Sequence, residues 1–228
     1  MDLCYFNPAT GIKRNPEKSR TRFLHAEELP AFFKALEEEQ NEIVRDFILI
    51  ALLTGARRSN VQQMRWEDIS FTRKEWLIPR TKNDEPQILP LCSEAMAILQ
   101  KRKVVGKSDY VFPGSGRTGY FIDPKKGWAR VLKQAGLKNL RLHDLRRTLG
   151  GWQAKSGTSL IVIGKSLGHT SVQATAVYAR LDIGAVRDSV EIATRAIIAA
   201  SKKKKIHLIF NAVAKKQVQP PNFLQLLG

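Results

Sequence analysis

Apolar residues recur at helical spacing along most of this chain of 228 residues, and this period constrains the fold more than any other feature. Between residues 42 and 53, for example, Ile43, Phe47 and Ile50 fall on one face, and Gly55 then supplies a helix stop. The chain is therefore expected to be mainly helical. Helices are predicted over residues 26–38, 42–53, 58–64, 93–101, 124–135, 143–155, 158–166, 171–180 and 184–200.

Two short runs break the helical period. EWLIP (residues 75–79) and QILPL (residues 87–91) have the length and composition of strands, and the polar residues RTKNDEP separate them. The pair predicts an antiparallel hairpin with Asn83 and Asp84 in its tip. The expected fold class is therefore mainly α with a small antiparallel β-sheet.

A chain of this length with 43% hydrophobic residues can form a sizeable core, as one compact domain with tails or as two small domains, and we favour one domain. Residues 1–22 are rich in Asn, Pro, Gly and basic residues, which is typical of a linker or arm. Residues 201–228 form a basic tail that contains the apolar run IHLIF. The main domain is expected over residues 23–200.

The formal net charge of +17 narrows the choice of partner. Residues 1–22 contribute +3 and residues 201–228 contribute +6, so +8 remains on residues 23–200. Such a surplus is typical of a protein that binds a polyanion, either nucleic acid or an anionic membrane. Because the sequence contains no apolar leader and no run of about 18 apolar residues, we expect no membrane span and a cytoplasmic location.

Several common kinds of site are excluded. Cys4 and Cys92 stand far apart without a CxxC spacing, which argues against a disulfide framework and a cysteine zinc site. The sequence also lacks the nucleotide-binding GxxxxGKS/T motif, the zinc-protease HExxH motif and an EF-hand loop. Its acidic residues fall in runs such as 37–39, which are typical of solvated helix faces rather than of a Mg²⁺ site. We therefore expect no metal and no cofactor.

The segment HDLRRTLGGW, residues 143–152, combines an apolar stripe with cations. Leu145 and Leu149 fit a helix that packs into a core, while His143 and Arg146, three residues apart, share another face. An imidazole beside a guanidinium on one face predicts an anionic ligand.

Four segments resemble, in order and in spacing, the motifs of the tyrosine recombinase (phage integrase) family. They are TGARRSNVQQMRWEDI from residue 54, TKN from residue 81, HDLRRT from residue 143 and LGHTSVQATAVYARL from residue 167. The resemblance covers most of residues 23–182 and implies the catalytic domain of that family, with residues 1–22 leading from an N-terminal DNA-binding domain. Many members carry an acid where this chain has Asn60 and a histidine where it has Arg147.

The resemblance also implies the chemistry. In that family a tyrosine attacks a DNA phosphodiester, leaving a 3′-phosphotyrosyl link and a free 5′ hydroxyl, and neither metal nor ATP is needed. The implied catalytic residues are Arg57, Lys82, His143, Arg146, His169 and Tyr178. Arg58, Arg80, Arg147 and Arg180 are expected to contact DNA.

Physical chemistry agrees with these roles. Without a metal, the charge on a five-coordinate phosphorus must be met by fixed donors, and the paired guanidinium groups of Arg57 and Arg146 suit this task. A phenol with a pKa near 10 needs a base, for which His143 is the best placed residue, while Lys82 is placed to protonate the leaving 5′ oxygen. His169 would then bond the phosphate.

Each assignment has a structural alternative. Tyr178 would otherwise be a half-buried aromatic residue, His143 a helix cap, His169 a donor to a backbone carbonyl, and Lys82 a solvated turn residue whose role Arg80 takes. For the whole chain, the alternatives to a recombinase are a DNA-binding relative without activity and a type IB topoisomerase-like strand transferase.

The expected partner is double-stranded DNA rather than a membrane, and the expected location is the nucleoid. A tetramer on DNA, with a monomer in its absence, is the expected assembly. Residues 206–213 are strand-prone, and we expect them to pair with a sheet edge of the same protomer or of a neighbour.

Overall fold

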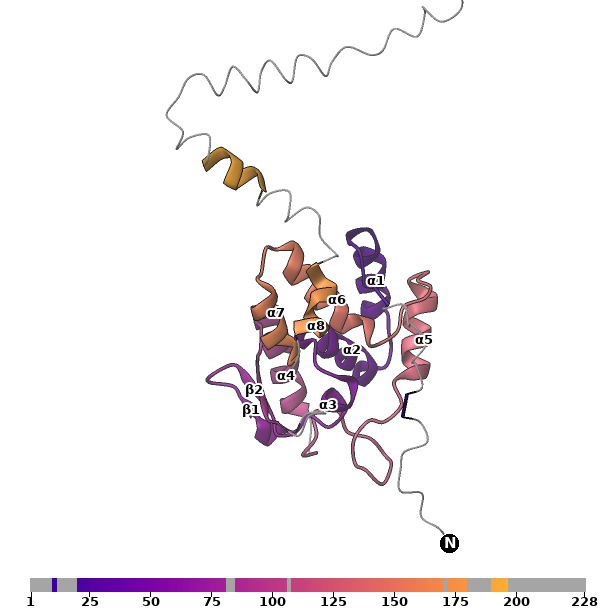
Figure 1. The fold of residues 1–228 in the computed structure, drawn as a ribbon. Coiled ribbons are helices and arrows are strands. Elements are labelled where there is room, and N and C mark those ends of the chain that lie inside the picture. The colour runs from indigo at the N-terminus through magenta and orange to yellow at the C-terminus, as the bar shows by residue number, and fades with distance from the viewer. Residues whose placement is uncertain are drawn as a thin grey trace, which may run out of the picture. The chain divides into compact units, whose positions relative to one another are not determined.

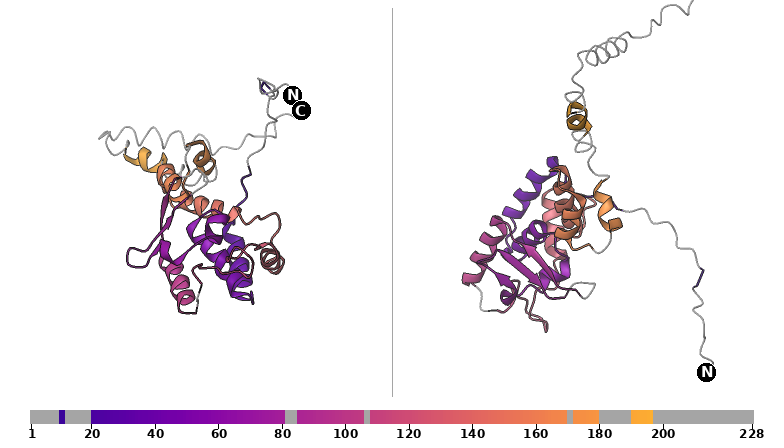
Figure 2. Two further views of the ribbon diagram at one scale, coloured as in Figure 1. Left: turned by 90° about the horizontal axis from the view of Figure 1, so that it is seen from below. Right: turned by 60° about the vertical axis from the view of Figure 1, so that its left-hand side comes forward.

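A computed structural model describes residues 10–11, 20–80, 85–105, 108–169, 172–179 and 190–196. The chain divides into two compact units, residues 1–149 and 150–228, and each is described by itself. Figure 1 labels most of the elements along the ribbon, and Figure 2 gives two further views. The elements are η1 (Ala26–Glu28), α1 (Leu29–Glu37), α2 (Glu42–Thr54), α3 (Arg58–Gln62), η2 (Trp66–Asp68), β1 (Ile69–Ser70), β2 (Glu75–Ile78), β3 (Gln87–Pro90), α4 (Ser93–Val105), α5 (Lys125–Gln134), α6 (Asp144–Lys155), α7 (Leu160–Leu167) and α8 (Val172–Ala179).

Helix α2 supplies the centre of the core of the first unit, where it contacts α3, α4 and α5 (Figure 1). Its start is fixed by Asn41, whose side chain accepts hydrogen bonds from the backbone N–H groups of the first turn. Phe47, Ile48 and Ile50 are fully buried, and the ring of Phe47 packs edge-on against Phe112. Burying these three large apolar side chains contributes to the driving force that folds this unit.

The small sheet confirms the predicted hairpin and adds one strand to it. Strands β2 and β3 are antiparallel, with Trp76 opposite Leu89 and Leu77 opposite Ile88. The first pair is buried and the second is exposed, as the alternation of a strand with one solvated face requires. Strand β1 pairs with β2 on the other side, giving the order β1-β2-β3. The predicted hairpin tip at residues 81–84 lies outside the described residues.

Most predicted helices of the first unit are present, with shifted ends. The segment 26–38 begins as the 3-10 turn η1, and the helix predicted to end at residue 101 continues as α4 to Val105. The helix predicted from residue 143 begins one residue later, at Asp144. The part of the chain that is described is thus mainly helical with a small antiparallel sheet, and the predicted fold class is confirmed.

The second unit contains the rest of α6 together with α7 and α8. Ser159 caps α7 through a hydrogen bond to the N–H of Val162, and Gly168 ends it in the left-handed conformation with φ 60°. Ile163 and Leu167 are buried on one face of α7. Of the helix predicted over residues 184–200, the structure describes only residues 190–196, which are helical.

Candidate active site

Arg57 is positioned by the turn that follows α2. Gly55 ends that helix in the left-handed conformation, with φ 60° and ψ 12°, which a residue with a side chain rarely adopts. Arg57 then takes the N-cap position of α3 in an extended conformation, and its carbonyl accepts hydrogen bonds from the N–H groups of Asn60 and Val61. The backbone on both sides of Arg57 is therefore fixed, while its side chain remains partly exposed.

Arg146 reaches the same turn from α6. Its side chain is only 6% exposed, and Nη1 donates a hydrogen bond of 2.7 Å to the carbonyl of Gly55. A buried guanidinium must be held by such acceptors, because its desolvation is costly. The contact links the first turn of α6 to the backbone two residues before Arg57.

His143 lies directly before α6, with one part of its surface exposed to solvent and another part buried. Partial burial lowers the pKa of its imidazole below the ordinary value of 6.5, and the positive charges of Arg147, Arg146 and Arg57 lower that pKa further. The carboxylate of Asp144 acts in the opposite direction. The first unit therefore brings Arg57, His143 and Arg146 close enough to influence one another electrostatically.

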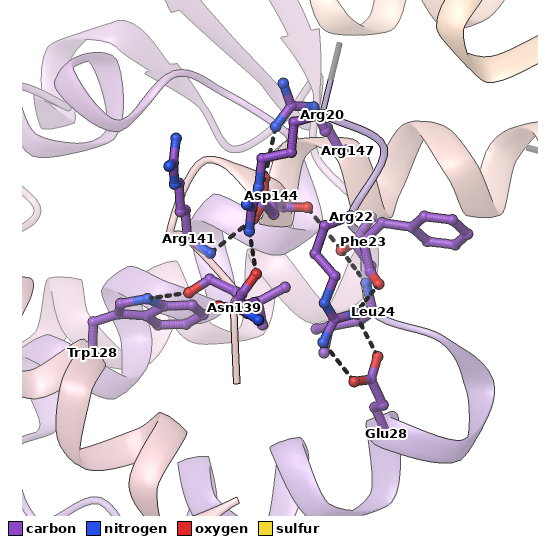
Figure 3. Close-up of polar contacts among 12 residues, drawn as sticks. Arg20, Arg22, Phe23, Leu24, Glu28, Trp128, Asn139, Arg141, Asp144 and Arg147 are labelled. Atoms are coloured by element: carbon purple, nitrogen blue, oxygen red, sulfur yellow. Dashed lines mark hydrogen bonds and ion pairs between the residues drawn. The ribbon is translucent and has the colours of Figure 1, made fainter. Parts of the chain in front are cut away.

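Asp144 is a member of this neighbourhood that the sequence analysis did not identify. Its side chain is 0% exposed, yet it accepts hydrogen bonds from the N–H of Arg141 at 2.8 Å and from Arg147 at 2.7 Å. Arg20 forms the third contact (Figure 3). Burial alone would raise the pKa of Asp144, but the bonds from Arg20, Arg141 and Arg147 outweigh it and hold this pKa below 3.8.

One part of this arrangement had a signal in the sequence. Asp144 follows Arg141 by three residues at the start of a predicted helix. At this spacing a carboxylate can accept a hydrogen bond from the backbone N–H of the earlier residue. The contact of Arg20 with Asp144 had no signal in the sequence, because the two residues lie 124 positions apart in the chain.

The arginines expected to contact DNA are placed as follows. Arg58 is exposed on the first turn of α3, and Arg147 is partly exposed while it pairs with Asp144. Arg80 is exposed and lines a cavity of about 370 Å³ together with Asn60 and other residues. Lys82 and Arg180 lie outside the described residues, so their roles stay predictions.

The second unit brings His169 and Tyr178 together. His169 follows Gly168 at the end of α7, where its N–H donates to the carbonyl of Gly164. Its Nδ1 lies 2.9 Å from Oγ1 of Thr175, and its ring stacks beside that of Tyr178 with centroids 6.1 Å apart. A hydrogen bond at Nδ1 fixes the orientation of the imidazole ring. Thr175, which is buried, was not identified as a site residue from the sequence.

Tyr178 is 3% exposed. A Cβ atom added to Gly150 would lie 2.6 Å from Cε1 and Cζ of its ring, so the tyrosine ring packs directly on the backbone of α6. This close approach requires glycine at position 150.

The described residues contain no group of three or more His, Cys, Asp or Glu side chains suited to hold a metal ion. Within the same part of the chain, no helix combines the length and the apolar composition that crossing a bilayer requires.

The sequence was compared with known protein families and curated proteins. The phage integrase family matches residues 22–184. Prophage integrase IntF of Escherichia coli (strain K12) is 30% identical over 153 residues, which make up 64% of this chain and 32% of that protein. The chain therefore spans about a third of this curated relative.

Two solved structures have a similar fold. The XerH site-specific recombinase bound to difH substrate in a pre-cleavage complex has a TM-score of 0.60 and 21% identity, covering 69% of this chain and 49% of that one. The catalytic domain of bacteriophage HP1 integrase has a TM-score of 0.58 and 19% identity, covering 74% of this chain and 93% of that one. At these identities the likeness shows the fold alone.

Proposed function

The chain belongs to the phage integrase family, and from this premise we propose that it is the catalytic domain of a site-specific recombinase that cuts and rejoins DNA through a tyrosine. The observation that carries the proposal is the grouping of Arg57, His143 and Arg146. Arg146 is bonded to the turn that carries Arg57, and both arginines act on the imidazole of His143. Two guanidinium groups beside one imidazole form an arrangement suited to a phosphodiester.

In the proposed reaction, Oη of Tyr178 attacks the phosphorus, the bond from phosphorus to the 5′ oxygen breaks, and a 3′-phosphotyrosyl link forms. His143 accepts the phenolic proton, and its lowered pKa suits this role because a base must be unprotonated at neutral pH. Lys82 protonates the departing 5′ oxygen. Arg57 and Arg146 stabilise the charge on the non-bridging oxygens, and His169 bonds one of them.

The tyrosine link conserves the energy of the broken bond, so the 5′ hydroxyl of a partner strand can later attack it without ATP. Since a side chain that is 3% exposed cannot meet a phosphate, the proposal requires Tyr178 to leave its present packing when DNA binds.

DNA is the proposed partner. The charge of +8 on residues 23–200 and the exposed Arg58 and Arg80 support binding to phosphates, with Arg147 and Arg180 as further contacts. Such contacts fix the protein on the duplex and carry little sequence information. Exchange of strands between two duplexes leads us to propose a tetramer on DNA, located in the cytoplasm at the nucleoid.

A nicked suicide DNA substrate tests the proposal. We expect a protein–DNA adduct that survives denaturant and EDTA, that is absent in Tyr178→Phe, and that persists in the control Tyr110→Phe. Binding of uncleaved duplex should be retained in Tyr178→Phe, because the substitution removes only a hydroxyl.

Other outcomes distinguish the alternatives. If DNA binds but no adduct forms with the wild-type chain, it is a DNA-binding relative without activity. An adduct that leads only to relaxation of supercoils, without exchange between two duplexes, indicates a topoisomerase-like strand transferase.

A further inference from the structure

Arg20 stands at the beginning of residues 20–24, a segment of the first unit that precedes η1; we call it the leading segment. The Arg20 side chain is 28% exposed and faces the buried carboxylate of Asp144 (Figure 3). Its Nε lies 3.0 Å from Oδ2 and 3.2 Å from Oδ1, and Nη2 lies 2.9 Å from Oδ2. Nη2 also donates to the carbonyl of Asn139. The guanidinium is thus held at both an acid and a carbonyl.

The leading segment contacts α6 a second time, one turn further along. The N–H of Leu24 donates a hydrogen bond of 3.0 Å to Oγ1 of Thr148, and that hydroxyl donates to the carbonyl of Asp144 at 2.8 Å. Leu24 and Thr148 are both buried. Residues 144 and 148 are four apart and share one face of α6, so the leading segment lies along that face.

Asp144 transmits this contact to the start of α6. One of its carboxylate oxygens accepts from the N–H of Arg141 and the other from Nη1 of Arg147. His143 and Arg146 lie within this bonded stretch of chain. A carboxylate that is buried and bonded on both oxygens has little freedom, so the turn before α6 is held in one conformation.

We propose that Arg20 and Asp144 are a positioning pair: the leading segment sets the orientation of the first turn of α6 and thereby of His143 and Arg146 toward the DNA phosphate. The inference rests on the proposed function. Neither residue of the pair touches the reacting atoms. Displacing the leading segment is therefore expected to slow cleavage while leaving DNA binding nearly intact.

The first test measures single-turnover adduct formation by the full 228-residue chain on the suicide substrate. Arg20→Ala is expected to lower the rate roughly tenfold, since a small misplacement of catalytic groups has effects of this order or larger. Arg20→Lys keeps the charge but loses the planar fork, so its rate is expected to lie between those of Arg20→Ala and the wild type.

The leading segment offers a matched control. Arg22 pairs with Glu28 through two bonds of 2.7 and 2.5 Å and is 20% exposed, but this pair does not involve α6. Arg22→Ala is therefore expected to cleave at the wild-type rate. Binding of uncleaved duplex, measured for each variant combined with Tyr178→Phe, is expected to change less than about threefold.

The second test uses the pH dependence of the same rate. The charged groups that act on His143 within the first unit are Arg57, Arg146, Arg147 and Asp144. Arg20→Ala leaves the negative charge of Asp144 less compensated, which raises the pKa of His143 and moves the acidic limb of the profile to higher pH. Asp144→Asn removes that negative charge and moves the limb to lower pH. A loss of packing alone would not move the two limbs in opposite directions.

Thermal unfolding of each variant shows whether it is folded at the assay temperature. If Arg20→Ala is not folded, the comparison is made with Arg20→Lys instead. An Arg20→Ala rate equal to that of Arg22→Ala, or limbs that move in the same direction, overturns the inference. Absence of any adduct with the wild-type chain is the different result that overturns the proposed function itself.

Discussion

At the residue scale, Arg146 has two tasks, one in stability and one in the proposed reaction, and two different measurements on one variant can report them separately. Its guanidinium satisfies the buried carbonyl of Gly55 and is proposed to bind phosphate. Arg146→Ala is expected to lower the free energy of unfolding by about 1–3 kcal/mol, because a buried acceptor loses its charged donor. It is also expected to abolish adduct formation. Urea unfolding and the suicide substrate measure the two effects.

The control for this prediction is Arg58→Ala, which removes an exposed guanidinium from the neighbouring helix. Its unfolding free energy should stay within about 0.5 kcal/mol of the wild type, as is usual for surface positions. A stable Arg146→Ala protein that still forms the adduct would contradict both assigned tasks.

Asp144 should make stability depend on acid. Its pKa in the folded protein lies below the ordinary value of 3.8, so its ionised form contributes stability that is fully present above the unfolded pKa. This contribution is lost as the pH falls through the folded pKa. The difference in unfolding free energy between the wild type and Asp144→Asn is thus expected to be constant above about pH 5 and to shrink below about pH 4.

Urea unfolding between pH 3 and 7 checks this expectation, with Asp109→Asn as the control because the Asp109 side chain is largely exposed. If the Asp144→Asn difference remains constant to pH 3, the carboxylate of Asp144 is not the source of the acid sensitivity.

The sequence could identify single site residues where a family motif carried them. Arg57, His143 and Arg146 stand in such motifs, and the structure brings these three together in the first unit. The partners that hold them were missed for a physical reason. Arg20 and Asp144 meet across 124 residues, and only the tertiary fold determines such a contact. Thr175 is buried against His169 but has no distinctive chemistry of its own.

At the scale of elements, the contact between α6 and α8 through Gly150 leads to a further prediction. A methyl group at this position would lie within 2.6 Å of the Tyr178 ring and 2.9 Å of Cδ1 of Leu167. Gly150→Ala is therefore expected to displace the ring and to lower the free energy of unfolding by about 1–3 kcal/mol, as overpacking commonly does.

Chemical denaturation and near-ultraviolet circular dichroism of the tyrosine band would detect both changes. Gly116→Ala is the matched control, because a Cβ atom there meets only Cδ1 of Ile122 at an ordinary 3.7 Å. Equal unfolding free energies for the two variants would show that the ring has room to move.

Periodicity predicted the long elements better than the short ones. The apolar stripe of α2 and the helix stop at Gly55 predicted the range 42–53, and the helix runs from Glu42 to Thr54. Strand β1 escaped detection because two residues, Ile69 and Ser70, cannot display an alternation. His143 was expected to be the first residue of α6, but the helix begins one residue later, at Asp144, whose carboxylate accepts a hydrogen bond from the N–H of Arg141.

At the scale of the whole molecule, the charge of +17 predicts a steep dependence of DNA binding on salt. Release of counterions from about 6–10 phosphate contacts lowers affinity by roughly 10³ to 10⁵ between about 50 and 200 mM salt. We expect the DNA affinity of the full chain to fall with salt concentration to this degree. The fall should be smaller after deletion of residues 201–228, which carry six lysines and no acid.

A second variant separates charge from structure in that tail. Replacing its six lysines by glutamine should reduce this dependence on salt as much as the deletion does, if the tail acts only through its charge. The predicted pairing of residues 206–213 with a sheet edge lies outside the described residues. It would appear as a loss of stability or assembly in the deletion but not in the glutamine variant.

The bond from Arg146 to the carbonyl of Gly55 joins the apolar helix α2 to the proposed phosphate clamp. A genetic screen scored only for loss of recombination would consequently collect substitutions at Phe47, Ile48 and Ile50, which are fully buried, beside those at the arginines. Measuring the amount of intact protein in each colony would separate the substitutions in α2, which lower abundance along with activity, from those at Arg57, which lower activity alone. Substitutions at Arg146 would fall with the α2 group, because this residue also stabilises the fold.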